Sequence, residues 1–261
     1  MPTLTSRDGM ALQYSLEGSG PPVLLHLGAG CDADLWRAAG HLKPLSQEFT
    51  CILFDHRGHG QSDHPRGPEA NHVDRYAADV FELLDALGLP SVGFWGYSNG
   101  ISVGMRVGEL APARLRALVG SGTIGRRTPA ELASMVSQSI AEYRQHGWEK
   151  MIAGFEEEEG EVPSWMKERI RSTDIEPVIG WSESRLTWGW SAWEALSRVQ
   201  TPTLFVVGEL EDPHDTMAEA VALMRDGRRV RVPGKGHINA FLDAEFVLPH
   251  VRQFLSLNGR S

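Results

Sequence analysis

The pentapeptide GYSNG at residues 96–100 is the stretch that most constrains how this chain can fold. It fits the pattern G-x-S-x-G and lies between an apolar run at 92–95 and an amphipathic segment that begins at Ile101. This order predicts a strand, a sharp turn and a helix, with the serine at the apex of the turn. Glycine at both ends of the motif allows strand and helix to approach without a clash of Cβ atoms. Ser98 is therefore the candidate nucleophile.

Short apolar runs alternate with helical patterns along most of the chain. Such runs are typical of strands buried on both faces of a parallel sheet, and the alternation predicts helices on both faces. Near the start, alternating apolar and polar residues at 10–16 predict an antiparallel strand. The other expected strands are 23–27, 51–54, 92–95, 115–119, 202–207 and 229–232, and the expected helices are 35–46, 74–88, 101–110, 216–224 and 245–257.

The segment 125–197 departs from this alternation. It holds six of the eight tryptophans, an acidic run at 156–159 and no strand pattern. We therefore expect residues 1–124 and 198–261 to form the core, with 125–197 inserted as a helical lid. Most of the tryptophans should pack the lid onto the core, while one or two face Ser98, because a lid needs an apolar underside to exclude water. The acidic run is typical of a solvated helix face.

Asp212 and His237 complete a candidate catalytic triad with Ser98. A serine hydroxyl is a weak nucleophile that needs an imidazole base, and the imidazole in turn needs a carboxylate to orient it. Asp212 and His237 each follow the carboxyl end of an expected strand. Because the carboxyl ends of parallel strands share one edge of a sheet, the three side chains can converge although they lie far apart in the sequence.

Over nearly its whole length the chain resembles the α/β-hydrolase superfamily. Besides the GYSNG turn, the loop DHRGHGQS at 55–62 resembles the D-x-R-G-x-G-x-S turn of that family. The order Ser, Asp, His matches the family's triad, and Gly236-His237 after the last expected strand also fits. The resemblance implies a mostly parallel eight-stranded sheet with helices on both faces and a helical lid insertion. It also implies that Asp55 and Arg57 are structural loop residues.

The loop after the strand at 23–27 departs from the family pattern. The family usually has His-Gly there, whereas this chain has His-Leu-Gly-Ala at 26–29, which makes His26 a strand residue. The resemblance then implies that the backbone N–H groups of Ala29 and Asn99 form the oxyanion hole, with Gly28 as the alternative to Ala29.

The position of the acid is a second departure. Asp212 stands four residues after Gly208, where three is the commoner spacing in the family. It precedes Pro213, as the family's acid often does, and is therefore the predicted partner of the histidine. Glu209 and Glu211 are the alternatives in the same loop.

Composition narrows the classes of partner. A net charge of −9 without a Lys/Arg cluster disfavours nucleic acid and anionic membrane surfaces. No apolar run approaches the roughly 20 residues that span a bilayer, and the segment 1–20 lacks a signal-peptide pattern, so we expect a cytoplasmic protein.

Cysteine and histidine usage gives no metal-binding pattern. Cys31 and Cys51 are too few for a disulfide framework, and they are expected to be small buried residues. His56, His59 and His64 share a loop without metal-ligand spacing. Neither a metal nor a cofactor is predicted, and the oligomeric state is left open.

Together these features predict a serine hydrolase acting on a small-molecule substrate. The expected reaction is cleavage of a carboxylic ester or lactone of a small, largely apolar substrate through an acyl-enzyme. Hydrolysis of a C–C bond in a dienoate, or cofactor-free perhydrolysis, would use the same triad. A non-enzymatic ligand-binding receptor on the same fold is a further alternative. A serine at the elbow argues against haloalkane dehalogenases and epoxide hydrolases, which use an aspartate nucleophile.

Overall fold

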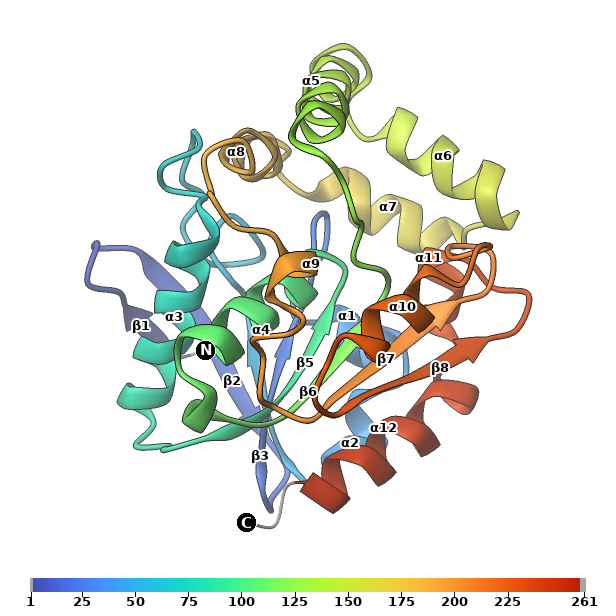
Figure 1. Cartoon of the computed structure of the whole chain (residues 1–261). Helices are drawn as coiled ribbons and strands as arrows, with labels where there is room; N and C mark the ends of the chain where they lie inside the picture. The colour runs from blue at the N-terminus through green and yellow to red at the C-terminus, as the bar shows by residue number, and fades with distance from the viewer. Residues whose placement is uncertain (1, 259–261) are drawn as a thin grey trace.

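A single sheet forms the centre of the molecule in the computed structural model, which describes residues 2–258 (Figure 1). The strand order is β1-β2-β4-β3-β5-β6-β7-β8. Both pairings of β2 are antiparallel and the others are parallel, so the predicted mostly parallel eight-stranded sheet is confirmed. The strands are β1 (Thr3–Thr5), β2 (Ala11–Glu17), β3 (Pro22–His26), β4 (Thr50–Phe54), β5 (Val92–Tyr97), β6 (Leu115–Ser121), β7 (Thr203–Gly208) and β8 (Gly227–Val232).

The helices of the core follow the predicted pattern, except that one predicted helix is divided and the short helix α11 was not predicted. The stretch 35–46 forms two short helices, α1 (Leu35–Ala38) and α2 (Leu42–Leu45), because Gly40 between them has a φ of 81°. The other core helices are α3 (Val73–Ala86), α4 (Asn99–Leu110), α10 (Thr216–Ala222), α11 (His237–Leu242) and α12 (Ala244–Asn258), with a 3₁₀ turn at Pro112–Arg114.

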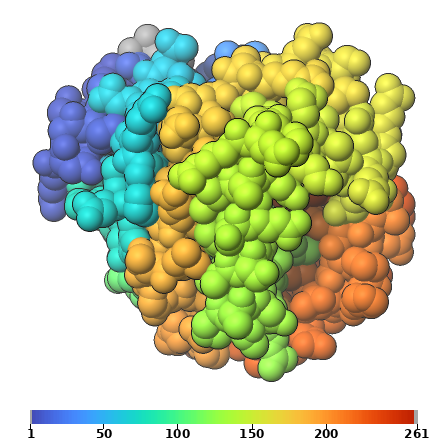
Figure 2. All heavy atoms as spheres, turned by 90° about the horizontal axis from the view of Figure 1, so that it is seen from above, coloured from blue at the N-terminus to red at the C-terminus, as the bar shows by residue number. Residues whose placement is uncertain are grey.

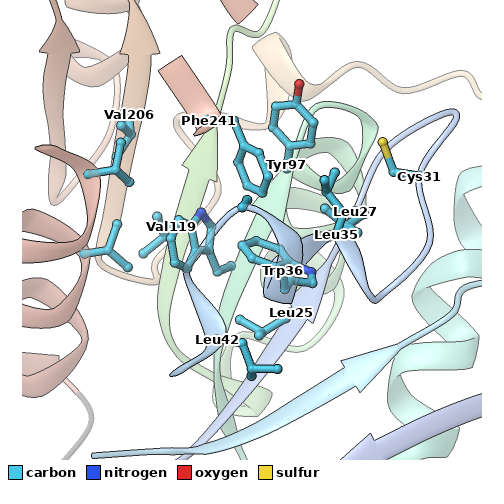
Figure 3. Packing of buried hydrophobic residues seen from close by; sticks show 14 of the residues in the cluster. Leu25, Leu27, Cys31, Leu35, Trp36, Leu42, Tyr97, Val119, Val206 and Phe241 are labelled. Carbon is cyan, nitrogen blue, oxygen red and sulfur yellow. The ribbon is translucent and has the colours of Figure 1, made fainter. Parts of the chain in front are cut away.

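Both faces of the sheet are covered by helices, which explains the near-continuous apolar runs of the strands. Successive side chains of a strand point to opposite faces. On β5, Trp95 faces the cluster formed with α1, α2 and α12, whereas Phe94 faces the cluster formed with α3 and α4. Figure 3 shows the first cluster, in which the rings of Trp36 and Phe241 lie 5.1 Å apart. Cys31 and Cys51 are free and buried in this cluster, as expected.

The chain between β6 and β7 is helical and contains no strand among its residues, all of which the structure describes. It holds α5 (Pro129–His146), α6 (Glu149–Glu159), α7 (Ser164–Ser172), α8 (Glu176–Ser184) and α9 (Ala192–Ala195). We call residues 129–195 the α5–α9 segment. Helices α5 to α8 lie together at the top of the molecule in Figure 1 and cover much of the face seen from above in Figure 2. A lid function for this segment stays a prediction.

No helix within residues 2–258 combines the length and the apolar character that crossing a bilayer requires.

The loop at 55–62 is tied down by buried ionic groups. Arg57 donates to the carboxylate of Asp79 with its Nε, at 2.7 Å, and with its Nη2, at 2.6 Å, and both side chains are almost fully buried. Asp8 accepts a further hydrogen bond from Arg57 at 3.0 Å. The carboxylate of Asp55 accepts from the backbone N–H of Ala33 at 2.7 Å and so anchors the loop that follows β3. These contacts give Asp55 and Arg57 the structural positions that the family resemblance implies.

We expect Arg57→Met to destabilise the fold strongly. The substitution leaves the Asp79 carboxylate buried without its cation, a change that typically costs about 3–5 kcal/mol of unfolding free energy. Urea unfolding followed by circular dichroism measures the loss. Arg7→Met is the control, because Arg7 is exposed and lies 3.9 Å from Glu82, and such pairs contribute up to about 1 kcal/mol. Equal losses of unfolding free energy in Arg57→Met and Arg7→Met would contradict a structural role for the buried Arg57–Asp79 pair.

Candidate active site

Ser98 stands in a strained turn between β5 and α4. Its φ of 57° and ψ of −123° are rare for a residue with a side chain. A Cβ on Gly96 would lie 2.4 Å from the carbonyl oxygen of Gly100, and one on Gly100 would lie 2.5 Å from that of His26. The expected need for glycine at both ends of the motif is therefore confirmed. The backbone N–H of Ser98 donates to the carbonyl of Ser121 at 2.9 Å, which fixes the turn to the end of β6.

The loop after β3 passes directly over the serine. A Cβ on Gly28 would lie 2.5 Å from the Cβ of Ser98 and 3.0 Å from the backbone nitrogen of Asn99, so no larger residue fits there. Ala29 and Asn99 line one small cavity. Among the hydrogen bonds of residues 2–258, none has the backbone N–H of Gly28, Ala29 or Asn99 as its donor. These donors are thus free to bind an oxygen beside Ser98.

His237 is held by Glu211. The imidazole Nδ1 lies 2.8 Å from Oε1 of Glu211, and since a carboxylate can only accept, Nδ1 carries the proton. The same oxygen accepts from the backbone N–H and the hydroxyl of Thr123, each at 3.0 Å. The pair leaves Nε2 of His237 as the basic nitrogen of the neutral ring. Ser98, Glu211 and His237 line the same cavity.

The prediction that Asp212 orients the histidine is wrong. The carboxylate of Asp212 accepts from the backbone N–H groups of Thr216 at 2.7 Å and Met217 at 2.9 Å, at the start of α10. Helix N-termini have unpaired N–H groups, and a carboxylate satisfies them well. Asp212 therefore stabilises α10, while its neighbour Glu211, the alternative from the sequence, contacts the imidazole.

The ring of His237 lies between two aromatic rings. Tyr97 of β5 stacks on it at a centroid distance of 4.9 Å, and Phe155 of α6 lies 5.4 Å away at an angle of 7°. Burial alone would lower the pKa of His237, but the negative charge and hydrogen bond of Glu211 raise it, with smaller contributions from Glu158 and Glu159. The pKa of His237 is raised overall. Burial alone would raise the pKa of Glu211, but the charge and hydrogen bond of His237 together with the two hydrogen bonds from Thr123 lower it overall.

The acidic run at 156–159 is not simply a solvated face, contrary to expectation. Glu159 accepts from the backbone N–H groups of Ile238 at 2.9 Å and Asn239 at 2.8 Å, and Glu158 accepts from that of His237 at 3.3 Å. These groups begin α11, so two carboxylates of α6 bind the helix N-terminus that carries the histidine. Glu156 is closer to the expected solvated position, since it pairs with Lys167 near the surface.

Three tryptophans line the cavity beside Ser98, where one or two were expected. They are Trp181, Trp188 and Trp190, and the cavity has a volume of about 230 Å³. Two of their indole N–H groups are engaged, that of Trp188 with the hydroxyl of Ser184 at 2.9 Å and that of Trp190 with Glu109 at 2.5 Å. Their rings thus present apolar walls to a ligand.

The fold and the site place the protein in a known class. A sequence model of the α/β-hydrolase fold family matches residues 21–244, and the chain belongs to this family. It is an α/β-hydrolase enzyme.

Relatives with named activities include hydrolases and peroxidases. The 3-oxoadipate enol-lactonase 2 of Acinetobacter baylyi is 26% identical, over 83% of this chain and 81% of the relative. A non-heme haloperoxidase of Rhodococcus erythropolis is 24% identical, over 98% of this chain and 99% of the relative. The crystal structure of a hydrolase from Pseudomonas aeruginosa PA01 has a TM-score of 0.82 and 26% identity and covers 97% of both chains. Another curated relative is 35% identical, but the match covers only 41% of this chain and 39% of that relative.

Matched substitutions of Glu211 and Asp212 test which of the two carboxylates acts on His237. We expect Glu211→Gln to lower kcat by ~10²- to 10⁴-fold, because an amide neither fixes the Nδ1–H tautomer nor stabilises the imidazolium. Asp212→Asn removes the same charge but keeps an acceptor for α10, so kcat should stay within about threefold of wild type. Hydrolysis of p-nitrophenyl butyrate measures both. A loss of kcat in Asp212→Asn but not in Glu211→Gln would instead support Asp212, the residue predicted from the sequence, as the partner of His237.

Proposed function

We propose that the protein is a serine hydrolase that cleaves a carboxylic ester or lactone through an acyl-enzyme. Ser98 is the nucleophile, His237 the general base and acid, and Glu211 the carboxylate that orients His237. The observation that carries the proposal is a serine in a strained turn that shares one cavity with a carboxylate-paired imidazole. This set of groups supplies acyl transfer to water.

The proposed reaction has two halves. The Oγ of Ser98 attacks the carbonyl carbon while its proton passes to Nε2 of His237, and the same proton then goes to the leaving alkoxide as the C–O bond breaks. In the second half a water molecule gives a proton to His237 and attacks the acyl carbon. Collapse returns that proton to Ser98 and releases the acid. With a lactone, the leaving hydroxyl stays part of the product.

The oxyanion formed in each half needs donors that are already in place. The proposed donors are the backbone N–H groups of Ala29 and Asn99, with Gly28 as the alternative to Ala29. Support comes from the close packing of Gly28 on Ser98 and from the absence of other acceptors for these N–H groups within residues 2–258. Each donor of this kind contributes about 3–4 kcal/mol to transition-state stabilisation.

The named relatives favour an enzyme over a non-enzymatic receptor. An enol-lactonase at 26% identity supports lactone cleavage. The haloperoxidase at 24% identity supports cofactor-free perhydrolysis as a second candidate, in which hydrogen peroxide replaces water in the second half of the reaction. Hydrolysis of a dienoate C–C bond and a cytoplasmic location stay predictions.

Ser98→Ala should abolish turnover of every accepted ester and lactone, because the acyl-enzyme cannot form without the hydroxyl. A panel of short-chain esters, lactones and dienoates, with and without hydrogen peroxide, measures turnover and identifies the preferred reaction. Intact-mass analysis after fluorophosphonate treatment should show one adduct on wild type and none on Ser98→Ala. Full turnover by Ser98→Ala would rule out the acyl-enzyme.

The pH dependence of kcat/KM should report the raised pKa of His237. The base must be neutral, so activity rises with pH, and the midpoint should lie above the usual imidazole pKa of about 6.5. Glu158→Gln removes a negative charge that favours the imidazolium, which lowers the pKa of His237 and moves the rising limb to lower pH. Glu157→Gln is the control, because Glu157 lies on the same helix but is not among the main causes of the raised pKa of His237. A shift of the limb to higher pH in Glu158→Gln would contradict this account.

A further inference from the structure

Arg185 stands out among the arginines of the molecule. It follows the last residue of α8 and lines the cavity that holds Ser98 and His237. Among the partly or fully buried arginines within residues 2–258, it is the one whose guanidinium has no hydrogen-bond or ion-pair partner. Removing a cation from bulk water without a partner is costly, which makes an unpaired guanidinium in a cavity a candidate ligand-binding group.

The acidic residues beside Arg185 in the sequence, in the cavity lining and near Arg127 have other partners. Glu183, on the same helix, pairs with Arg144 at 3.2 Å. Glu211, the acidic residue of the cavity lining, is bound to His237. Glu131, at the start of α5, closes a capping box with Thr128. No side chain of the described structure thus neutralises the guanidinium.

A second cation lies close to the first. Arg127 also lines the cavity, and its guanidinium lies against the backbone of Gly125. Burial lowers the pKa of Arg185 to about 10, and repulsion from Arg127 adds to this effect. Arg185 therefore stays charged at neutral pH but lacks a counter-ion. Two cations on one cavity wall stand in contrast to the chain's net charge of −9.

We propose that Arg185, assisted by Arg127, binds a carboxylate of the substrate. This inference rests on the proposed acyl-enzyme reaction at Ser98 and names its substrate class: a monoester of a short dicarboxylic acid, or a lactone of a short hydroxy-dicarboxylic acid, with the free carboxylate on the acyl part. A guanidinium presents two parallel N–H donors that match the two oxygens of a carboxylate. An anion on the acyl part would hold that part through both halves of the reaction, whereas the alcohol of a monoester leaves after the first half.

The walls of the cavity suit such a molecule. Trp181, Trp188 and Trp190 can cover the methylene groups between the ester and the carboxylate. The volume of about 230 Å³ is below the range typical of drug-sized ligands and fits a short chain. The proposal differs from the expectation of a largely apolar substrate in that it places one anionic group on the substrate.

Two esters of matched shape test the proposal. Monomethyl glutarate carries the carboxylate, and methyl 5-methylhexanoate replaces it with an isopropyl group of similar outline. We expect wild type to prefer monomethyl glutarate in kcat/KM. Arg185→Gln should lower kcat/KM for monomethyl glutarate by ~10- to 100-fold, chiefly through KM, and leave the neutral ester unchanged or faster. Arg185→Lys keeps the charge but loses the paired donors, so its kcat/KM for monomethyl glutarate should lie between those of wild type and Arg185→Gln.

Arg126→Gln is the matched control, because Arg126 is exposed, precedes Arg127 and does not line the cavity. It should leave the preference intact. Equal losses on both esters in Arg185→Gln, or no preference in wild type, would overturn the inference and leave the serine hydrolase intact. Turnover of both esters by Ser98→Ala would overturn the proposed reaction instead.

Binding without turnover gives an independent readout. Isothermal titration of Ser98→Ala with glutarate should show an affinity that falls by ~10- to 100-fold in the Ser98→Ala, Arg185→Gln double variant. Absence of glutarate binding, or equal affinity in the two proteins, would overturn the inference. Tighter binding of inorganic phosphate than of glutarate would also overturn it, since the cations would then serve a phosphate group.

Discussion

The active-site edge of this molecule depends on one strained turn at Ser98. A residue with this φ and ψ costs about 1–3 kcal/mol, and the turn persists because the surrounding backbone leaves no alternative. Gly96 lets β5 and α4 approach within contact distance, Gly100 lets α4 approach the end of β3, and Gly28 lets the loop after β3 pass over the serine. The buried strands on either side of β5 hold these segments in register. The sheet and its two helical layers thus hold the partly buried Ser98 at the edge of the sheet, where it lines the cavity.

The α5–α9 segment contributes to the site as well as covering it. Phe155 of α6 stacks on one face of His237, opposite Tyr97 of the core. Glu158 and Glu159 bind the backbone at the start of α11 and add to the charge that raises the pKa of the imidazole. The position and the basicity of the histidine therefore depend on both parts of the chain. Removal of the segment would leave the N-terminus of α11 without its carboxylates.

Most of the fold could be predicted from the sequence because strands buried on both faces produce apolar runs that are hard to mistake. Three elements were not predicted correctly. β1 has only three residues and no alternation long enough to detect, and α11 is a six-residue helix directly after a glycine turn. The stretch 35–46 has a continuous helical pattern, yet the positive φ of Gly40 divides it in two. In each case the local signal was short or ambiguous, and packing on the sheet determined the outcome.

The sequence by itself determined the candidate nucleophile and the candidate base, because Ser98 and His237 stand in local motifs whose glycines and flanking strands specify the backbone around them. The choice of acid was decided by the tertiary structure. Glu211 and Asp212 are adjacent in one loop, and only the docking of α10 shows that Asp212 is taken up by its N–H groups while Glu211 reaches the imidazole. Arg185 carries no local signal either. Its lack of a counter-ion is a property of the cavity, which forms from residues brought together from both parts of the chain.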